Sequence, residues 1–221
     1  MTAPDQTEII IEPVQQDDLE PYVSCLVTAF NDKFPLFFKD IPQETYEKVM
    51  RDLFWATRDK DNPDKPLHGG YVLKRHSAEH VTGERVVAAF NIILYDMKTE
   101  PWWPGWKALN RHISFWKALR AGYWLQALGQ KKVAIDELYL DFIGVFPAYR
   151  GQGIGSAIFS FLEEVAEKKG LNTMSLYVSC KNTRAKKLYE QLGFTEKKKI
   201  KIFLSNYRLG IPFYYLMEKE L

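Results

Sequence analysis

The sequence predicts an α+β domain with a mixed, mostly antiparallel sheet and a helical insert. Three observations lead to this prediction. Two strand-like runs between Tyr71 and Tyr95 are joined by a turn at Gly83, which is typical of an antiparallel meander. Between Glu137 and Gly170 an apolar strand, a glycine-rich turn and an amphipathic helix follow one another. From Thr195 to Glu218 the chain ends in two further strand-like runs, which predict a terminal hairpin.

The remaining elements are predicted from periodicity and from capping residues. In the first part of the chain we expect a strand at 8–13, a helix from Asp17 or Asp18 to Phe30, an aromatic loop at 34–38 and a helix at 42–58. In the second part we expect a central strand at 132–146, a strand at 171–179 and a helix that begins at Asn182 and ends at Gly193.

Composition bounds the function. A chain of 221 residues with 46% hydrophobic residues can form one domain with a sizeable core, so we expect a single domain over residues 1–221. The formal net charge of +2 gives no argument for nucleic acid. Cys25 and Cys180 match no metal spacing, so no metal site is expected. Neither a signal peptide nor an apolar run of membrane-spanning length is evident, which predicts a cytoplasmic protein.

Residues 98–130 form an insert that holds five of the six tryptophans. Apolar residues at helical intervals predict one helix from about Ala108 to Leu128, with basic residues between them. Such a helix can be a flap packed over the acceptor side of its own domain, a dimer or partner contact, or a helix lying on a lipid surface. The sequence leaves these three alternatives open.

The turn Arg150-Gly151-Gln152-Gly153-Ile154-Gly155 predicts an anion site. Glycines allow a tight turn, and the free N–H groups at the start of the following helix attract a phosphate. Two familiar glycine loops are excluded, because the spacing G-x-G-x-G differs from the dinucleotide fingerprint and because no Gly-Lys-Ser/Thr of a Walker loop is present.

Two motifs resemble those of the GCN5-related N-acetyltransferase (GNAT) family. Residues Val145–Gly155, VFPAYRGQGIG, are similar to its V-x-P-x-Y-R-G-x-G-I-G signature, and Asn182–Phe194, NTRAKKLYEQLGF, to its N-x-x-A-x-x-L-Y-x-x-x-G-F helix. The resemblance implies an α/β/α sandwich whose sheet is splayed at the cofactor strand. It also implies acetyl-CoA (coenzyme A) as cofactor and direct transfer of an acetyl group to a primary amine of a small molecule or peptide.

The resemblance assigns cofactor-binding positions. The strand backbone before the turn would pair with the pantetheine arm, the turn would hold the pyrophosphate, and the second motif would contribute one amide and one lysine. The residues implied are Ile143, Gly144, Val145, Arg150, Gly151, Gln152, Gly153, Ile154, Gly155, Ser156, Asn182 and Lys186.

The chemistry needs a general acid for the leaving sulfur and a base for the amine. The resemblance implies Tyr189 as the acid. Glu137 and Asp141 are the candidate bases, because a regular strand places both on one face with Ile143 and Val145. A structural Asp141 and a water-only mechanism remain alternatives.

Rival functions are a CoA-binding regulatory module without turnover and a peripheral membrane protein that uses the insert. A homodimer also stays open. In the resembling family the first helices line the acceptor pocket, so Phe34, Phe37 and Phe38 are either core residues or substrate contacts. The aromatic insert suggests an apolar or aromatic acceptor.

Overall fold

The computed structural model describes residues 9–31, 33–56, 69–75, 85–97, 102–128, 132–201 and 211–221. Within them a seven-stranded sheet has the order β1-β2-β3-β4-β5-β7-β6, and only β4 and β5 pair in parallel. The strands are β1 Ile9–Pro13, β2 Gly70–Arg75, β3 Arg85–Leu94, β4 Glu137–Val145, β5 Thr173–Ser179, β6 Thr195–Ile200 and β7 Tyr214–Glu220. The predicted mixed, mostly antiparallel α+β fold is confirmed.

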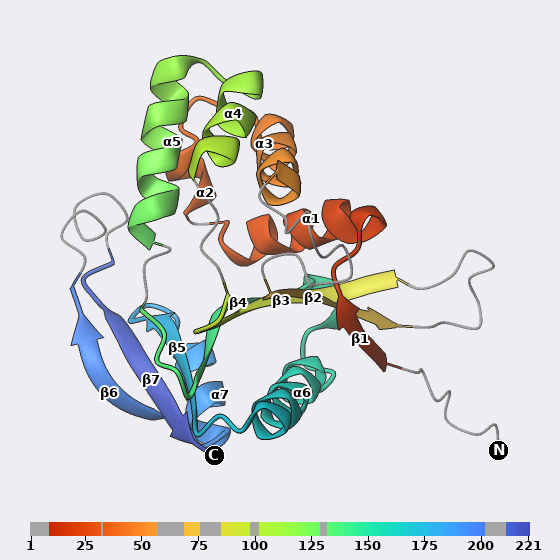
Figure 1. Ribbon diagram of the computed structural model, residues 1–221, viewed down its shortest axis with the longest axis vertical. Coiled ribbons are helices and arrows are strands. Elements are labelled where there is room, and N and C mark those ends of the chain that lie inside the picture. Colours follow the sequence, from red (N-terminus) through yellow and green to blue (C-terminus); the bar gives the residue numbers. More distant parts are fainter. Residues whose placement is uncertain are drawn as a thin grey trace.

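Helices cover both faces of the sheet (Figure 1). On one face lie α1 Leu19–Ala29, α2 Phe34–Phe37, α3 Gln43–Ala56, α4 Trp102–His112 and α5 Phe115–Leu128. On the other lie α6 Ile154–Lys169 and α7 Thr183–Gln191. Each face has its own apolar cluster of buried side chains, one beneath α1 to α5 and one above α6 and α7. This three-layer arrangement is the expected α/β/α sandwich.

The sheet parts between its two central strands. β4 and β5 pair only from Glu137–Leu140 to Thr173–Leu176. Beyond Leu140, β4 continues beside β3 up to Val145, while β5 continues beside β7 up to Ser179. The edges of β4 and β5 that face each other therefore have no strand partner over their last residues, and the expected splay at the cofactor strand is confirmed.

A β-bulge lies at the point where the sheet parts. Asn91 of β3 lies opposite Phe142, and Ile92 lies opposite Leu140, so Asp141 is an extra residue in β4. A bulge reverses the alternation of side chains between the two faces. Leu140 and Ile143 consequently pack on the same side, although they are three positions apart in the sequence. The expectation that Glu137, Asp141, Ile143 and Val145 share one face is wrong for this reason.

The insert contains two helices where one was expected. α4 begins at Trp102, before Pro104. The helix is interrupted at Ile113 and Ser114, and α5 begins after them. Proline is tolerated in the first turn of a helix, where its missing N–H would have no partner. The Ser114 carbonyl accepts the first hydrogen bond of α5, from the N–H of Ala118 at 2.9 Å, as an N-terminal cap does.

Two smaller expectations were also wrong. Phe34–Phe37 form the short helix α2, since Pro35 at the first turn favours a helix start over a loop. The central strand begins at Glu137 and not at residue 132, because residues 135–136 turn before it. In the insert, His112 is partly buried, and its Nε2 lies 2.8 Å from Oδ2 of Asp52 on α3. The turn predicted at Gly83 lies outside the described residues.

The two insert helices pack on the same domain. α4 lies along α3, and Gly105 makes this possible, because a Cβ there would lie 2.8 Å from Leu53. α5 lies against α2, where Trp124 stacks on Phe37 with ring centroids 5.6 Å apart. Nζ of Lys117 donates to the Asp40 carbonyl at 2.7 Å. These contacts anchor the insert over the first helices.

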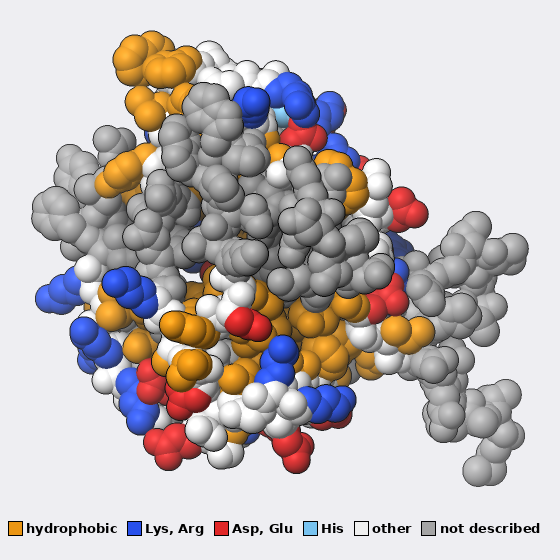
Figure 2. Space-filling model, in the orientation of Figure 1, with side chains coloured by type: hydrophobic (Ala, Val, Ile, Leu, Met, Phe, Trp, Pro, Cys, Tyr) orange, Lys and Arg blue, Asp and Glu red, His pale blue; other side chains and the backbone are white. Residues whose placement is uncertain are grey.

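The outer face of α5 carries large apolar side chains. Figure 2 shows hydrophobic side chains gathered at the end of α5 that lies farther from the sheet. The exposed ones on α5 are Phe115, Trp116, Leu119 and Tyr123. Among the described residues no helix combines the length and apolarity needed to cross a bilayer.

Candidate active site

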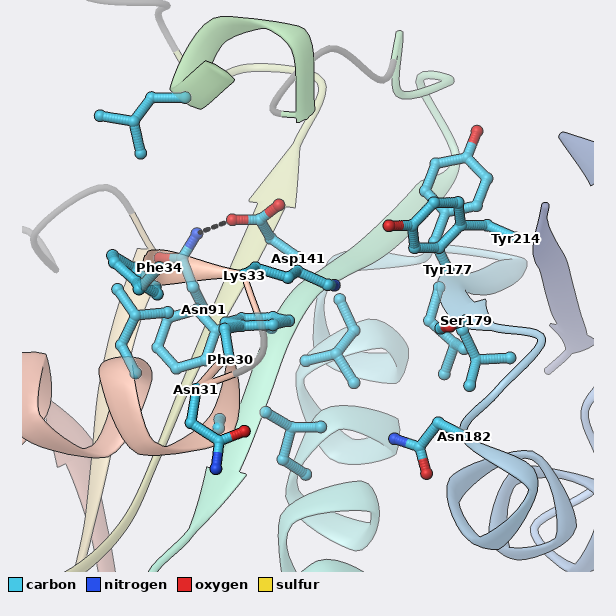
Figure 3. Close-up of a pocket in the computed structure, with 18 of the residues that line it drawn as sticks. Phe30, Asn31, Lys33, Phe34, Asn91, Asp141, Tyr177, Ser179, Asn182 and Tyr214 are labelled. Carbon is cyan, nitrogen blue, oxygen red and sulfur yellow. Dashed lines mark hydrogen bonds between the residues drawn. The ribbon is translucent and has the colours of Figure 1, made fainter. Parts of the chain in front are cut away.

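A cavity of about 810 Å³ fills the gap where the sheet parts. One wall is the end of β4 together with α1, α2 and α3, and the other is the end of β5 with the start of α7 and β7. In Figure 3, Phe30, Phe34, Asn91 and Asp141 lie on one side, while Tyr177, Ser179 and Asn182 lie on the other. Residues far apart in sequence thus face one another across the parted strands.

Asp141 is the acidic group of the cavity. Because it is the bulged residue of β4, its side chain turns toward the cavity, where Nδ2 of Asn91 donates a hydrogen bond to its Oδ2 at 3.4 Å (Figure 3). The residue as a whole is open to solvent, yet protein atoms surround its carboxylate closely. This burial raises the pKa of Asp141 to about 6, although the Asn91 amide lowers it. A carboxylate of this kind can accept a proton near neutral pH.

Glu137 lies apart from this carboxylate and does not line the cavity. It is buried at the start of β4, where its two oxygens are engaged. Oγ of Ser175 donates to Oε1, and the N–H of Ala134 donates to Oε2 at 2.9 Å. The contacts of Glu137 tie β4 to β5 and to the preceding turn, and the structure does not bring it together with Asp141.

Tyr189 reaches the cavity from α7. Its ring packs against Phe159 and Phe194, with centroids 5.7 and 6.1 Å away, and is 7% exposed. Desolvation by burial raises the pKa of Tyr189 to about 12, so the phenol keeps its proton throughout the neutral range. Asn182 also lines the cavity and caps α7 as expected, because its Oδ1 accepts the Ala185 N–H at 3.1 Å.

The glycine turn has the geometry of an anion site. Gly151 and Gly153 have φ of 80° and 78°, in the left-handed region that favours glycine. Gly153 is the N-cap of α6 and offers no side chain to the first-turn N–H groups of Ile154, Gly155 and Ser156. An added Cβ at either glycine would meet nothing within 4 Å, so the turn opens to solvent. Free N–H groups and the helix dipole both favour a negative ligand here.

Three side chains expected to bind the cofactor have partners within the protein. Nε of Arg150 donates to the Val145 carbonyl at 3.0 Å. Gln152 accepts a hydrogen bond from Nη1 of Arg75 at 2.6 Å and donates to the Ala148 carbonyl at 3.1 Å. Lys186 pairs with Glu190 at 2.6 Å. The first two brace the glycine turn, and the third ties α7 internally.

Packing of α1 on β4 explains why residue 144 is a glycine. A Cβ at this position would lie 3.0 Å from Sγ of Cys25 and 3.1 Å from both Cβ of Ala29 and the Cys25 carbonyl oxygen. Glycine is therefore required because α1 packs directly on β4. Ile143, the preceding residue, lines the cavity.

The cavity includes residues that the sequence interpretation missed. Asn91 is the clearest, and its signal was a single polar residue in the apolar run VVAAFNIILY. Tyr139 and Tyr177 form an edge-to-face pair with centroids 5.8 Å apart. Lys33 spans the cavity, with Nζ 4.4 Å from the Phe30 ring centroid and 5.3 Å from that of Tyr214. No local pattern marks these last residues, because only the fold brings them together.

The aromatic wall comes from the first helices. Phe34 and Phe37 line the cavity, whereas Phe38 is fully buried behind them. The described tryptophan side chains of the insert, Trp106, Trp116 and Trp124, do not line it, and α5 contributes Leu125 instead.

Comparison with known proteins identifies sequences that are similar to this chain. Residues 98–194 match the sequence profile of the Acetyltransferase (GNAT) family. An uncharacterized N-acetyltransferase of Methanocaldococcus jannaschii is 35% identical over 82 residues, which are 37% of this chain and 34% of that protein. The ribosomal protein bS18-alanine N-acetyltransferase of Escherichia coli K12 is 40% identical over 72 residues, 33% of this chain and 49% of that one. The matched regions thus span less than half of each of these relatives.

Solved structures resemble the whole chain. One described as an acetyltransferase superposes with a TM-score of 0.61 at 21% identity and covers 96% of this chain and 98% of its own. An N-acetyltransferase from Staphylococcus aureus Mu50 gives 0.58 at 19% identity, over 95% and 99% of the two chains. At this identity the likeness concerns the fold.

Proposed function

Because residues 98–194 match the acetyltransferase (GNAT) family profile, we propose that this chain is an acetyl-CoA-dependent N-acetyltransferase acting on a primary amine of a small molecule or peptide. The observation that carries the proposal is the cavity between the parted strands. Its lining includes Asp141, Tyr189 and Asn182. Cys25 and Cys180 are free thiols, which suits the reducing cytoplasm that we propose as its location.

The residues present fit acetyl-CoA. The edge of β4 at Ile143, Gly144 and Val145 has no strand partner on the β5 side, so its backbone groups, apart from the Val145 carbonyl that accepts from Arg150, would be available to the pantetheine amides. The turn from Gly151 to Ser156 would hold the pyrophosphate on its N–H groups. When bound, acetyl-CoA would supply an activated acetyl group for direct transfer to the acceptor nitrogen, with the CoA thiolate as leaving group and no covalent acyl-enzyme.

The side chains of the cavity supply proton transfer at both ends of this exchange. We propose that Asp141 takes the proton from the acceptor amine, since its raised pKa and its position in the cavity suit a general base. Tyr189 gives its phenolic proton to the leaving sulfur, since it stays protonated at neutral pH. Glu137 remains the alternative base and would have to act through water, because its oxygens are already engaged.

Two glycine variants test cofactor binding. Gly153 and Gly170 lie at opposite ends of α6, with φ of 78° and 65° and no neighbour within 4 Å of an added Cβ. Alanine at either site costs about 1–2 kcal/mol of backbone strain. We expect Gly153→Ala to weaken CoA binding about tenfold or more, and Gly170→Ala to leave it unchanged, both measured by calorimetry.

The same protein is then assayed for amine-dependent thiol release from acetyl-CoA. Release above the hydrolysis background supports the enzyme. Tight CoA binding with no release from any amine would favour a non-catalytic CoA-binding module. Equal loss of CoA affinity in both glycine variants would contradict the assignment of the phosphate to the turn.

A further inference from the structure

The cavity has two chemically different regions on the acceptor side. Asp141 is the acidic residue among the described side chains that line it. Around it the wall is apolar and comes from four helices, with Phe30 after α1, Phe34 and Phe37 on α2, Phe54 on α3 and Leu125 on α5. A ligand that fills this side must therefore present one cationic or proton-donating group and otherwise apolar surface.

We propose that the acceptor is a small primary amine carrying an aromatic or similarly bulky apolar group, bound with its nitrogen at Asp141 and its apolar group against the wall formed by α2, α3 and α5. This inference rests on the proposed acetyltransferase function and names the substrate class of that site. The insert thus contributes directly to the acceptor site, through Leu125 of α5.

The charged side chains of the cavity favour one position for the nitrogen of the acceptor amine. Lys33 and Lys181 also line the cavity, and Nζ of Lys33 rests between the rings of Phe30 and Tyr214. A cationic amine is repelled by these two lysines and attracted to the carboxylate, so its nitrogen is oriented toward Asp141. Asn91 holds the Asp141 carboxylate in place through the 3.4 Å hydrogen bond.

Size favours a small acceptor. The volume of about 810 Å³ must hold both the thioester arm and the acceptor. Phe34 and Phe37 are buried and packed against each other and against Tyr46 and Trp124, with centroid distances from 5.6 to 6.1 Å. This stacked wall is a fixed surface for a ring, since aromatic rings favour such contacts.

The test compares 2-phenylethylamine with ethanolamine, which keeps the ammonium but lacks the ring. Calorimetry on the CoA-saturated chain measures both dissociation constants, and thiol release measures kcat/KM. We expect the ring to tighten binding at least about 30-fold, as burial of its apolar surface predicts. A peptide with N-terminal phenylalanine is the third acceptor.

Two leucines of α5 give a matched pair of variants. Leu125→Gln places a polar group in the wall and is expected to weaken 2-phenylethylamine binding about tenfold, with CoA affinity retained. Leu119→Gln makes the same chemical change at a position that is 47% exposed and outside the cavity, and is expected to change neither constant.

The outcomes separate this inference from the function on which it rests. Binding and turnover of ethanolamine equal to those of 2-phenylethylamine would overturn the apolar class, and a tenfold preference for the peptide would overturn the small acceptor. CoA binding without turnover of any of the three amines would also overturn the acceptor class. Failure of CoA to bind at all would overturn the proposed function and the acceptor class together.

Discussion

Replacing Asp141 by asparagine tests the assignment of the base most directly. The substitution keeps the size of the side chain and removes its ability to accept a proton. Nδ2 of Asn91, which donates to Asp141 at 3.4 Å in the native protein, can still donate to the amide oxygen of the new asparagine. The cavity shape should therefore survive, and any loss of activity would come from the lost proton acceptor.

The expected size of the effect follows from the pKa of about 6. In the native protein kcat/KM should fall below pH 6, and at pH 5 only about a tenth of the molecules carry the charged carboxylate. Above pH 7 Asp141 is ionised and no longer limits the rate. In the Asp141→Asn variant this break should disappear, and the plateau rate should fall roughly 100-fold, as loss of general-base catalysis does.

The assay is thiol release from acetyl-CoA, followed from pH 5 to pH 9 with the best amine acceptor. Glu137→Gln is the matched control, since it neutralises the other candidate carboxylate and leaves the cavity lining intact. We expect it to keep the break near pH 6. A break that persists in Asp141→Asn and vanishes in Glu137→Gln would refute the reasoning and assign the base to Glu137.

Three further predictions concern stability and the general acid. Folding raises the pKa of Asp141 above its ordinary value, so its stabilising protonated form is fully present below about pH 4 and lost as the pH rises through about 6. Asp141→Asn should therefore unfold at a higher temperature than the native protein at pH 8, and a scan at pH 4 should show the advantage gone. Gly144→Ala should lower the free energy of unfolding by about 1–3 kcal/mol, which is ~2–10 °C in Tm for a domain of this size, since its Cβ would crowd Cys25 and Ala29 at 3.0–3.1 Å. Gly122→Ala, with only Leu109 at 3.4 Å, should leave Tm unchanged or raise it, and a fall equal to that of Gly144→Ala would contradict the packing argument. Tyr189→Phe should reduce kcat by about 100-fold while calorimetry shows CoA affinity retained; unchanged kcat would exclude the phenol as general acid.

Most of the fold could be predicted because its signals are local. The strand, glycine turn and helix from Glu137 to Gly170 carry their periodicity and their stop signals within one stretch, and Gly170 has the expected left-handed φ of 65°. The break in the insert was harder to predict, because apolar residues continue at helical intervals on both sides of Ser114. Ser114, a residue type favoured at helix N-caps, is the local sign of that boundary.

The candidate site was less predictable, for a geometric reason. Counting residues along β4 assumes regular alternation, and the bulge at Asp141 breaks that assumption without leaving a pattern in the sequence. The register depends on β3, where Asn91 and Ile92 lie opposite residues that are not consecutive. A single strand cannot report such a mismatch with its neighbour, so the loss of a common face for Glu137, Ile143 and Val145 emerged only from the pairing.

The contact of α1 with Gly144 has a consequence for redesign of this protein. At Gly144 the end of β4 packs directly against α1, next to Cys25 and Ala29, and this helix leads into Phe30 at the cavity wall. A substitution that pushes this helix outward would disturb both substrates at once. Efforts to change acceptor preference are therefore better directed at Leu53 or Leu125, which line the cavity from α3 and α5 and not from the helix that packs on Gly144.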